Sequence, residues 1–583
     1  MKLPMLNELP TTREMINVFG GYNHNLRIGE GEFYDMKNLT SADYPVLSPR
    51  SRRGIYASPN NPQGMIEKDA LCYVDGTDFV INEYHIDMGL STAEKDCPKT
   101  LISMGAYVII MPDKKYINTK DYSDKGNIEA DIETSGNTTF ELCKIDGTAY
   151  KNATAQDTAP TAEDAALWID TSSVPHSLKQ YSSTNATWVS IATTYIKISF
   201  TGISKLPFEA GDGVTISGLK DTALSDLDGT MVVQEVGEGY IVVIGILDRK
   251  TTISTKITIE RLMPEMDFII ESENRLWGCR YGKDINGNVV NEIYSSKLGD
   301  FKNWNVFHNP SISTDSYVAS VGTDGQFTGA ITHLGYPIFF KENCMHKVYG
   351  NYPANYQIQT THCRGVQKDC SKSLAIVNEV LYYKSRSAIC VYDGSLPVEI
   401  SSILGDITYS NAVAGTIRNK YYVSMMDADG AYHLFVYDTK RGLWHREDST
   451  HIIDFCTCRG ELYYIESGDK RIKTILGSGT PDTTAIEWMA ESGVIGTDSP
   501  DKKYISRLDV RMKLTVGTRV YFYIEYDSCG KWEHLFTMTG VTLRSFAVPI
   551  RPRRCDHMRI RIEGDGEAKI YSICKTIEQG SDI

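Results

Sequence analysis

A short pattern of strand, turn and strand recurs along this chain, and it limits the fold more than any other feature. In one copy, residues 421–423 (Tyr-Tyr-Val) lead through the turn at 427–430 to residues 434–438 (Leu-Phe-Val-Tyr-Asp). In another, residues 381–383 lead through a polar turn to residues 390–394. Aromatic and β-branched runs that are split by turn residues are typical of β-hairpins. Hairpins repeated at roughly 40-residue spacing, with no helices between them, favour a β-propeller.

The copies fall into two groups. Two hairpins precede residue 120 and five lie between residues 265 and 478, so we expect about seven blades, with six or eight as alternatives. Residues 121–264 interrupt the repeat with a polar stretch and then a small set of alternating strands. Residues 479–583 carry strands that alternate with period 2 and are separated by frequent turns, which is typical of a β-sandwich.

The predicted fold class is therefore all-β: a β-propeller with an inserted small β domain and a C-terminal β-sandwich. Residues before the first blade are broken by prolines and glycines, so we expect them to run across a domain instead of forming one. The predicted parts are an extended N-terminal strap (1–60), the first blades (61–120), the inserted β domain (121–264), the remaining blades (265–478) and the sandwich (479–583).

The charge and cysteine content narrow the class of protein. A net charge of −14 argues against tight nucleic-acid binding, which needs an excess of lysine and arginine. A surface past which DNA slides is still compatible with that charge. The 13 cysteines have no framework spacing, so we expect free, buried thiols in a reducing cytosol. The first residues contain no apolar signal segment, and the apolar run at 240–247 is too short to span a bilayer. We therefore expect synthesis in the cytoplasm and no membrane segment.

Several side chains are candidates for metal or redox chemistry. Two histidines and two cysteines between residues 346 and 370 match no zinc-binding spacing. The thiols at 456 and 458 lie two residues apart in one predicted strand and so share a face. The turn at 427–430 begins like a calcium loop but lacks its downstream glutamate. We expect packing or turn roles for all of them: His346, His362, Cys363 and Cys370; Cys456 and Cys458; and residues 427–430.

Aspartates near strand ends are candidates for glycosidase chemistry, and clustered arginines are candidates for a phosphate site. Some propellers are glycosidases and need two carboxylates across a pocket, yet no aspartate near a strand end has a signature that separates it from a turn residue. The arginine clusters predict solvated faces or ion pairs between subunits, with a phosphate site as the alternative. The residues concerned are Asp267, Asp315, Asp324, Asp393 and Asp438, and Arg50, Arg52, Arg53, Arg551, Arg553, Arg554, Arg559 and Arg561.

No catalytic residue, cofactor site or metal site is expected from these patterns. The sequence has no nucleophile elbow, phosphate-binding loop or dinucleotide fingerprint. The sequence therefore predicts a protein that is not an enzyme and binds no cofactor. Because a propeller serves many functions, the fold by itself does not identify one.

Two parts of the chain resemble a known family. The strap and one tryptophan-bearing blade are similar to tailed-bacteriophage nozzle, or tail-hub "stabilisation", proteins of the short-tailed type. The matching stretches are residues 19–22 (Phe-Gly-Gly-Tyr), 36–39 (Met-Lys-Asn-Leu), 49–54 (Pro-Arg-Ser-Arg-Arg-Gly), 274–278 (Asn-Arg-Leu-Trp-Gly), 292–300 and 303–304 (Asn-Trp).

The resemblance implies a structural virion protein in the tail of a phage or prophage. Such a protein forms a homo-oligomeric ring, commonly a hexamer, around the DNA exit channel, where it retains and then releases the genome. Its implied partners are further copies of itself, the portal or adaptor, other tail proteins and passing DNA without sequence-specific binding. The main alternative is a propeller that binds or cleaves host glycans during adsorption. A third reading is a bacterial scaffold that docks proteins on its rim.

Overall fold

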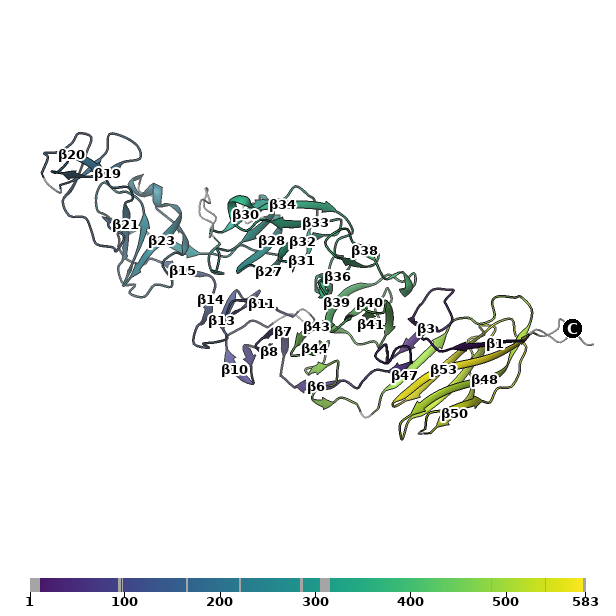
Figure 1. Cartoon of the computed structure of the whole chain (residues 1–583). Helices are drawn as coiled ribbons and strands as arrows, with labels where there is room; N and C mark the ends of the chain where they lie inside the picture. Colours follow the sequence, from purple (N-terminus) through teal and green to yellow (C-terminus); the bar gives the residue numbers. More distant parts are fainter. Residues whose placement is uncertain are drawn as a thin grey trace, which may run out of the picture. The chain divides into compact units, whose positions relative to one another are not determined.

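The computed structural model is built almost entirely from β-strands (Figure 1). It divides into two compact units: Met1–Leu101 with Phe327–Lys347 and Gln359–Ile583, and Ile102–Gln326 with Val348–Ile358. The residues that the structure describes are 11–92, 96, 98–163, 166–219, 222–283, 287–304, 315–483, 485–540 and 542–579.

Within the described residues, seven sheets of the propeller-blade type follow one another in sequence, and six of them are simple four-stranded sheets in sequence order. The first two are β7 (Pro62–Lys68), β8 (Ala70–Asp75), β9 (Asp78–Ile81) and β10 (Tyr84–Asp87), then β11 (Thr100–Met104), β12 (Tyr107–Met111), β13 (Lys115–Asn118) and β14 (Lys125–Asn127). The third and fourth are β27 (Phe268–Ser272), β28 (Arg275–Lys283), β29 (Val289–Ser295) and β30 (Tyr317–Ser320), then β31 (Phe327–His333), β32 (Tyr336–Lys341), β33 (Cys344–Tyr349) and β34 (Gln357–His362).

The remaining blades come from the second half of the chain. The fifth is β35 (Ala375–Val377), β36 (Val380–Lys384), β37 (Ile389–Tyr392) and β38 (Val398–Glu399), and the sixth is β39 (Ser410–Ile417), β40 (Lys420–Met426), β41 (Tyr432–Asp438) and β42 (Leu443–Arg446). The seventh is β43 (Ile452–Cys458), β44 (Glu461–Glu466) and β45 (Ile472–Thr474), completed by β6 (Gly54–Ala57) from the N-terminal segment and by β46 (Thr480–Pro481). Short 3₁₀ turns lie at Pro353–Asn355, Ser371–Ser373 and Ser402–Leu404.

The aromatic hairpins of the sequence are the buried central strands of these sheets. Tyr422 and Val436 of the sixth blade pack against Leu462 and Tyr464 of the seventh in one apolar cluster. This packing explains the repeat, because each sheet must bury its apolar residues against the next. The predicted fold class is confirmed: the chain is an all-β propeller with seven blade sheets, an inserted β domain and a C-terminal sandwich. The residue boundaries assigned to its five parts stay a prediction.

The insertion holds two sheets. Eight strands form the larger one, in the order β15-β26-β22-β23-β24-β21-β16-β25, and four form the smaller one. The larger comprises β15 (Ala130–Glu133), β16 (Thr138–Cys143), β21 (Tyr195–Phe200), β22 (Gly213–Ser217), β23 (Gly229–Gly237), β24 (Tyr240–Ile244), β25 (Thr251–Ile253) and β26 (Thr258–Arg261), with a 3₁₀ turn at Thr222–Leu227. The smaller comprises β17 (Ala153–Gln156), β18 (Leu167–Asp170), β19 (Ser177–Ser182) and β20 (Thr187–Ser190).

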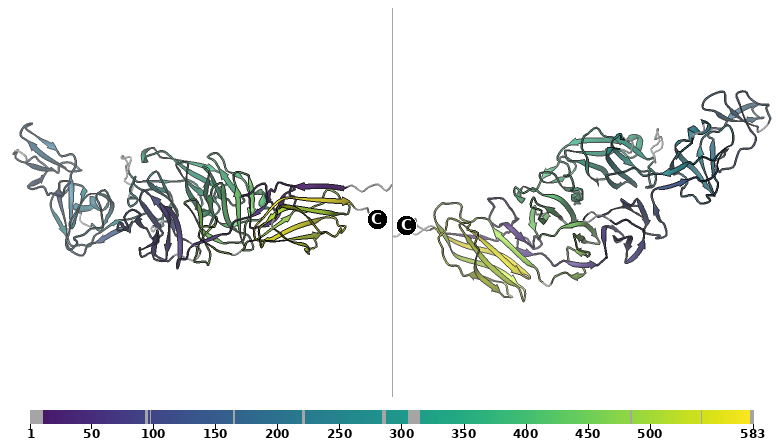
Figure 2. Two further views of the ribbon diagram at one scale, coloured as in Figure 1. Left: turned by 60° about the horizontal axis from the view of Figure 1, so that its bottom comes forward. Right: turned by 180° about the vertical axis from the view of Figure 1, so that it is seen from behind.

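Two sheets make the C-terminal sandwich, and the N-terminal segment adds strands to both (Figures 1 and 2). One runs β1-β53-β48-β51 and the other β2-β3-β47-β52-β49-β50. Their strands are β1 (Thr11–Ile16), β2 (Gly21–Tyr22), β3 (Glu32–Lys37), β47 (Glu487–Ser492), β48 (Lys503–Leu514), β49 (Arg519–Tyr526), β50 (Glu533–Thr539), β51 (Arg544–Val548), β52 (Met558–Asp565) and β53 (Ala568–Gln579). The short strands β4 (Leu39–Thr40) and β5 (Ser48–Pro49) pair with each other.

Close backbone contacts hold the N-terminal segment against the sixth blade. Gly21 has φ +82° and lies so near that strand that an added Cβ would be 2.4 Å from the carbonyl oxygen of Trp444. The backbone N–H of Asn38 donates to the carbonyl of Glu447 at 2.6 Å. The contact at Gly21 explains the glycine there, because its φ is positive and a side chain has no room beside the strand.

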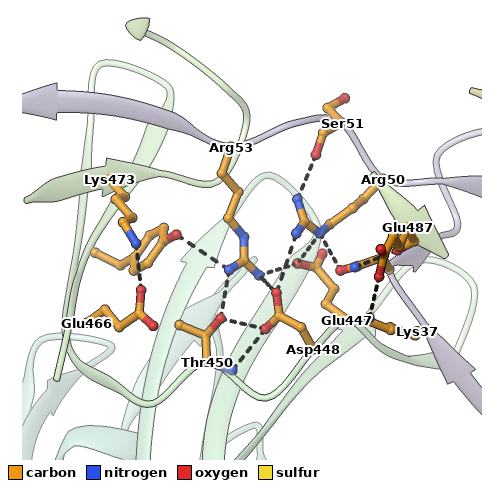
Figure 3. Close-up of polar contacts among 12 residues, drawn as sticks. Lys37, Arg50, Ser51, Arg53, Glu447, Asp448, Thr450, Glu466, Lys473 and Glu487 are labelled. Carbon is orange, nitrogen blue, oxygen red and sulfur yellow. Dashed lines mark hydrogen bonds and ion pairs between the residues drawn. The ribbon is translucent and has the colours of Figure 1, made fainter. Parts of the chain in front are cut away.

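A buried cluster of charges joins the same segment to the sixth and seventh blades (Figure 3). Arg53 is only 4% exposed, and its guanidinium lies 3.0 Å from a carboxylate oxygen of Glu447 and 2.8 Å from one of Asp448. Arg50 lies 3.4 Å from both carboxylates, and Thr450 accepts a hydrogen bond from Arg53. Burial alone would raise the pKa of Asp448, but the two arginine charges hold it below its usual value.

We predict that Arg53→Met lowers the free energy of unfolding by about 3–5 kcal/mol, because it leaves two carboxylates buried without their main partner. Urea unfolding followed by tryptophan fluorescence measures the change. Arg52→Met is the matched control, since Arg52 is exposed; its effect should stay within about 0.5 kcal/mol. Equal losses in the two variants would contradict a stabilising role for the cluster.

Candidate functional site

An open cavity of about 1380 Å³ lies at one edge of the fourth to sixth blades. In a four-stranded antiparallel sheet, the turn between the second and third strands and the link that leaves the fourth strand lie at the same end of the strands. This end of the blades is the edge at which the cavity lies. The cavity is built from such turns at Glu342–Asn343 and 385–388, and from the links at 363–367 and 400–409. Blade geometry therefore brings together loops that are distant in sequence.

The N-terminal segment forms one wall of the cavity through His24, Asn25, Leu26 and Tyr34. The backbone N–H of His24 donates to the carbonyl of Ile403 at 2.8 Å, and its ring stacks on Tyr34 with centroids 4.2 Å apart. Leu26 is 91% exposed. The wall is thus attached to the propeller at His24, while the side chain of Leu26 is exposed to solvent.

At Gly405 the 400–409 link lies close to the backbone of the N-terminal segment. The φ of Gly405 is +81°, and an added Cβ would lie 2.9 Å from the carbonyl oxygen of His24. A larger residue would be strained and would press against the N-terminal segment.

Charges of both signs line the cavity. Arg364 and Glu399 form an ion pair at 2.8 Å, so these two charges offset each other. No hydrogen bond or ion pair engages the side chain of Asp406 or Arg386 within the described residues. The cations are Arg364, Lys384 and Arg386, and the carboxylates are Glu342, Glu399 and Asp406.

Lys384 is the most deeply buried of these charges, with 3% of its surface exposed. Its ammonium donates to the side-chain oxygen of Gln367 at 2.8 Å and to the carbonyl oxygen of Ser385 at 2.5 Å. Burial lowers the pKa of Lys384, and the nearby Cys370 and Cys390 oppose that shift only in part. Both of its acceptor residues also line the cavity.

Neutral polar and aromatic groups complete the lining. Ser401 accepts a hydrogen bond from the backbone N–H of Ile389 at 2.9 Å, which fixes its hydroxyl. Burial raises the pKa of Tyr409 to about 12, so its phenol stays neutral at physiological pH. The hydroxyl-bearing side chains of the lining are Tyr34, Ser385, Ser387, Ser401, Ser402, Thr408 and Tyr409. Such a surface can make many hydrogen bonds to a polyhydroxylated ligand.

The candidate metal residues of the sequence do not converge. His346 is buried, with one ring nitrogen 2.9 Å from the Thr360 hydroxyl and the other 3.8 Å from the Cys344 thiol. Cys370 accepts from the backbone N–H of Ala412 instead. Within the described residues, no group of three histidine, cysteine, aspartate or glutamate side chains could hold a metal ion.

The cysteines of the described part of the chain are free thiols, and most are buried. Burial raises the pKa of Cys72 to about 12 and of Cys143 to about 11, and it raises that of Cys456 further. A thiol with a raised pKa holds its proton and is a poor nucleophile. Cys456 and Cys458 belong to an apolar cluster between the seventh and first blades, which is a packing role.

The aspartates weighed as glycosidase candidates lie outside the cavity lining. Asp393 accepts from the backbone and hydroxyl of Ser395, as a turn residue does. Asp438 is buried and binds Ser41 and Arg441, so it ties the N-terminal segment to the sixth blade. Asp267 pairs with Arg280 at 2.7 Å. Asp315 and Asp324 are likewise outside the lining.

The carboxylate of Asp427 holds the turn at 427–430. Asp427 accepts from the N–H groups of Asp429 and Ala431 and lies 2.7 Å from a ring nitrogen of His433.

The carboxylates that the fold does gather in the cavity are Glu342, Glu399 and Asp406. No sequence signature marks them: Glu342 lies in a turn, Glu399 ends strand β38 and Asp406 lies in a link between blades.

The arginine-rich strand of the sandwich makes its ion pairs within this chain. Arg559 and Arg561 both pair with Glu491, and Arg559 also pairs with Glu525. Arg553 pairs with Glu533 at 2.7 Å. Ion pairs between subunits are therefore not needed to account for these three arginines.

The tryptophan-bearing blade uses its distinctive residues for packing. Arg275 is buried, and its guanidinium donates to the carbonyls of Ser296 at 2.8 Å and Asp315 at 2.6 Å. Asn303 donates to the carbonyl of Gly211 at 2.6 Å and so ties the blade to the insertion. The stretch that carries the family resemblance thus supports the third blade and the insertion beside it.

No protein-family model matches the chain, and no curated protein matches it. Among solved structures, it is similar to an exo-β-1,3-galactanase from Phanerochaete chrysosporium, with 9% identity, 53% of this chain and 94% of that chain covered, and a TM-score of 0.23. An engineered GH43 glycoside hydrolase with endo-xylanase and exo-arabinofuranosidase activity matches at 10% identity, with 53% and 96% covered and a TM-score of 0.21. A mutant of Trypanosoma rangeli sialidase matches at 10% identity, with 91% and 95% covered and a TM-score of 0.18.

These matches correct one expectation. The sequence motifs led us to expect a protein that is not an enzyme, yet the three solved structures named above are enzymes, glycoside hydrolases among them. That exclusion was wrong, because it rested on the lack of a recognisable sequence motif. The resemblance to phage tail proteins stays a prediction. In the described residues, no helix has the length and apolar character needed to cross a membrane.

Two buried histidines of the propeller predict a pH dependence of stability. Burial, helped by the charge of Lys341, lowers the pKa of His346 to about 4. Burial, helped by Lys420, lowers that of His445 to about 3. Below about pH 6.5 the unfolded chain takes up a proton on each ring that the folded chain does not. Their contribution to stability is therefore complete above pH 6.5 and is lost as the pH falls.

We predict that the free energy of unfolding falls by up to about 1.4 kcal/mol per pH unit for each histidine between pH 6 and 4.5. Urea unfolding at half-unit intervals measures the slope. His445→Phe should reduce that slope by about one proton, since it removes one titrating ring. Parallel curves for the variant and the wild type would contradict a buried, neutral His445.

Proposed function

We propose that the protein is a glycan-binding β-propeller protein, and that the cavity at the edge of the fourth to sixth blades is its binding site. The observation that carries the proposal is the lining: hydroxyls, amides, charges of both signs and aromatic rings surround about 1380 Å³ of open space. That volume accommodates several sugar rings, because small-ligand pockets typically measure about 300–1,000 Å³.

The chemistry of the lining suits sugars better than apolar ligands. Carboxylates and guanidinium groups form paired hydrogen bonds with neighbouring hydroxyls, while aromatic rings cover the apolar face of a sugar ring. Arg364, Glu399 and Asp406 supply the charged groups for hydrogen bonding, and Tyr34 and His24 supply the rings. Carboxylates could also serve glycan cleavage, so release of reducing sugar is measured together with binding.

We predict that Asp406→Asn weakens binding of the preferred glycan by about 10- to 100-fold, the scale of a lost charge-assisted hydrogen bond. A glycan array identifies that glycan, and calorimetry measures the affinity of each variant. Asp429→Asn is the matched control, because Asp429 lies in a turn of the sixth blade outside the cavity. A wild-type protein that binds no glycan would overturn the proposal, and so would equal losses in the two variants.

A second function, compatible with the first, is structural. We propose that the chain is a bacteriophage tail protein that assembles with copies of itself into a hexameric ring around the DNA exit channel, in contact with the portal or adaptor. The resemblance of residues 19–22, 36–39 and 274–278 to nozzle proteins favours this reading. The N-terminal segment supports it as well, because its strands complete sheets of both the propeller and the sandwich. The net charge of −14 suits a channel that DNA passes without being held.

We predict a closed ring of several copies, with hexamers commonest, in electron micrographs and analytical ultracentrifugation of the purified chain. Antibody labelling should place it in the virion tail. A stable monomer that is absent from every phage particle would contradict the structural role and leave the glycan proposal standing.

A further inference from the structure

We propose that the glycan bound in the cavity is acidic, and that the ammonium of Lys384 binds its carboxylate or sulfate group. This inference rests on the proposed glycan-binding function and names the class of ligand. Lys384 lies in the wall of the cavity, together with the two residues that accept its hydrogen bonds.

Other buried lysines of this chain show what Lys384 lacks. Lys575 has a side chain that is 1% exposed, and it lies 3.0 Å from Glu14 and 2.7 Å from Glu30. Lys473 lies within 2.8 Å of two carboxylates. In both cases negative charge offsets the cost of taking an ammonium out of water. Lys384 has no carboxylate partner among the described residues.

A third buried lysine is a closer comparison. In the described part of the chain Lys503 also has no carboxylate partner, but its ammonium donates to three backbone carbonyls, those of Gly496, Ser499 and Asp556, at 2.5–2.6 Å. A lysine ammonium has three donors, so Lys503 is fully satisfied. Lys384 uses two, with Gln367 and Ser385, and no described acceptor takes the third. One donor and one uncompensated charge are therefore left at the cavity wall.

The surroundings of Lys384 favour an anion there. The carboxylate of Glu399 is paired with Arg364, so it does not offset Lys384. Arg386, two residues further along the same turn, adds a second positive charge that is exposed. A carboxylate or sulfate on a sugar would accept from the free donor of Lys384 while its hydroxyls meet the rest of the lining.

The test compares each acidic glycan with its neutral counterpart. Oligogalacturonate and the matching galactose oligomer differ only in the carboxylate, and sulfated and unsulfated galactose oligomers form a second pair. These pairs are printed on the array with the other glycans, and the acidic glycan that binds best is taken to calorimetry with its neutral partner. We expect the acidic member to bind about 10- to 100-fold more tightly. Lys384→Met should reduce that preference to about twofold or less.

Two further variants separate binding from folding. Lys503→Met removes a buried lysine from the sandwich and should leave the preference unchanged, with thermal unfolding checking that each variant folds. If Lys384→Met does not fold, Arg386→Gln on the exposed turn should still lower the preference severalfold. A carboxylate and a sulfate are distinguished by which pair shows the larger preference.

Three results would overturn the inference: neutral glycans bound as tightly as acidic ones, a preference that survives both Lys384→Met and Arg386→Gln, or inorganic sulfate alone competing at the affinity of the glycan. A wild-type protein that binds no glycan of any kind would instead overturn the proposed function, so the two failures are distinguishable.

Discussion

The attachment of the N-terminal segment to the blades is the constraint on which the rest of this structure depends. Strand β6 completes the seventh blade, and Arg53, a residue before it, is buried against Glu447 and Asp448. A buried charge must be paired, so the arginine and the two carboxylates fix one register for the segment. The same segment also runs along the sixth blade and adds strands to both sheets of the sandwich.

The same N-terminal segment also forms one wall of the candidate site. The cavity is walled on one side by blade turns and links and on the other by the residues around His24, which the same segment places there. The amide of Asn38 donates to the carbonyl of Glu487, 449 residues away, which shows how far apart in sequence the joined parts lie. One element therefore both joins the propeller to the sandwich and walls the cavity.

Sequence patterns predicted the fold well because each blade is local. A hairpin such as residues 421–438 is defined by its own alternation and turn, so its existence can be read without knowing its neighbours, while the number of blades stayed open between six and eight. The site could not be found in this way. Glu342 lies in a turn, Glu399 ends the short strand β38 and Asp406 lies in a link, and only the stacking of blades brings them into one lining.

By itself the sequence determined an all-β chain with repeated blades, an insertion and a sandwich, because strand and turn signals act over a few residues. Tertiary structure decided the pairing of β1, β3 and β6 with strands from the other end of the chain, since such pairing depends on contacts between distant segments. It also decided which charges are compensated. Lys384 and Lys503 look alike in the sequence, and only their surroundings leave one with a free donor beside a cavity and the other fully bonded.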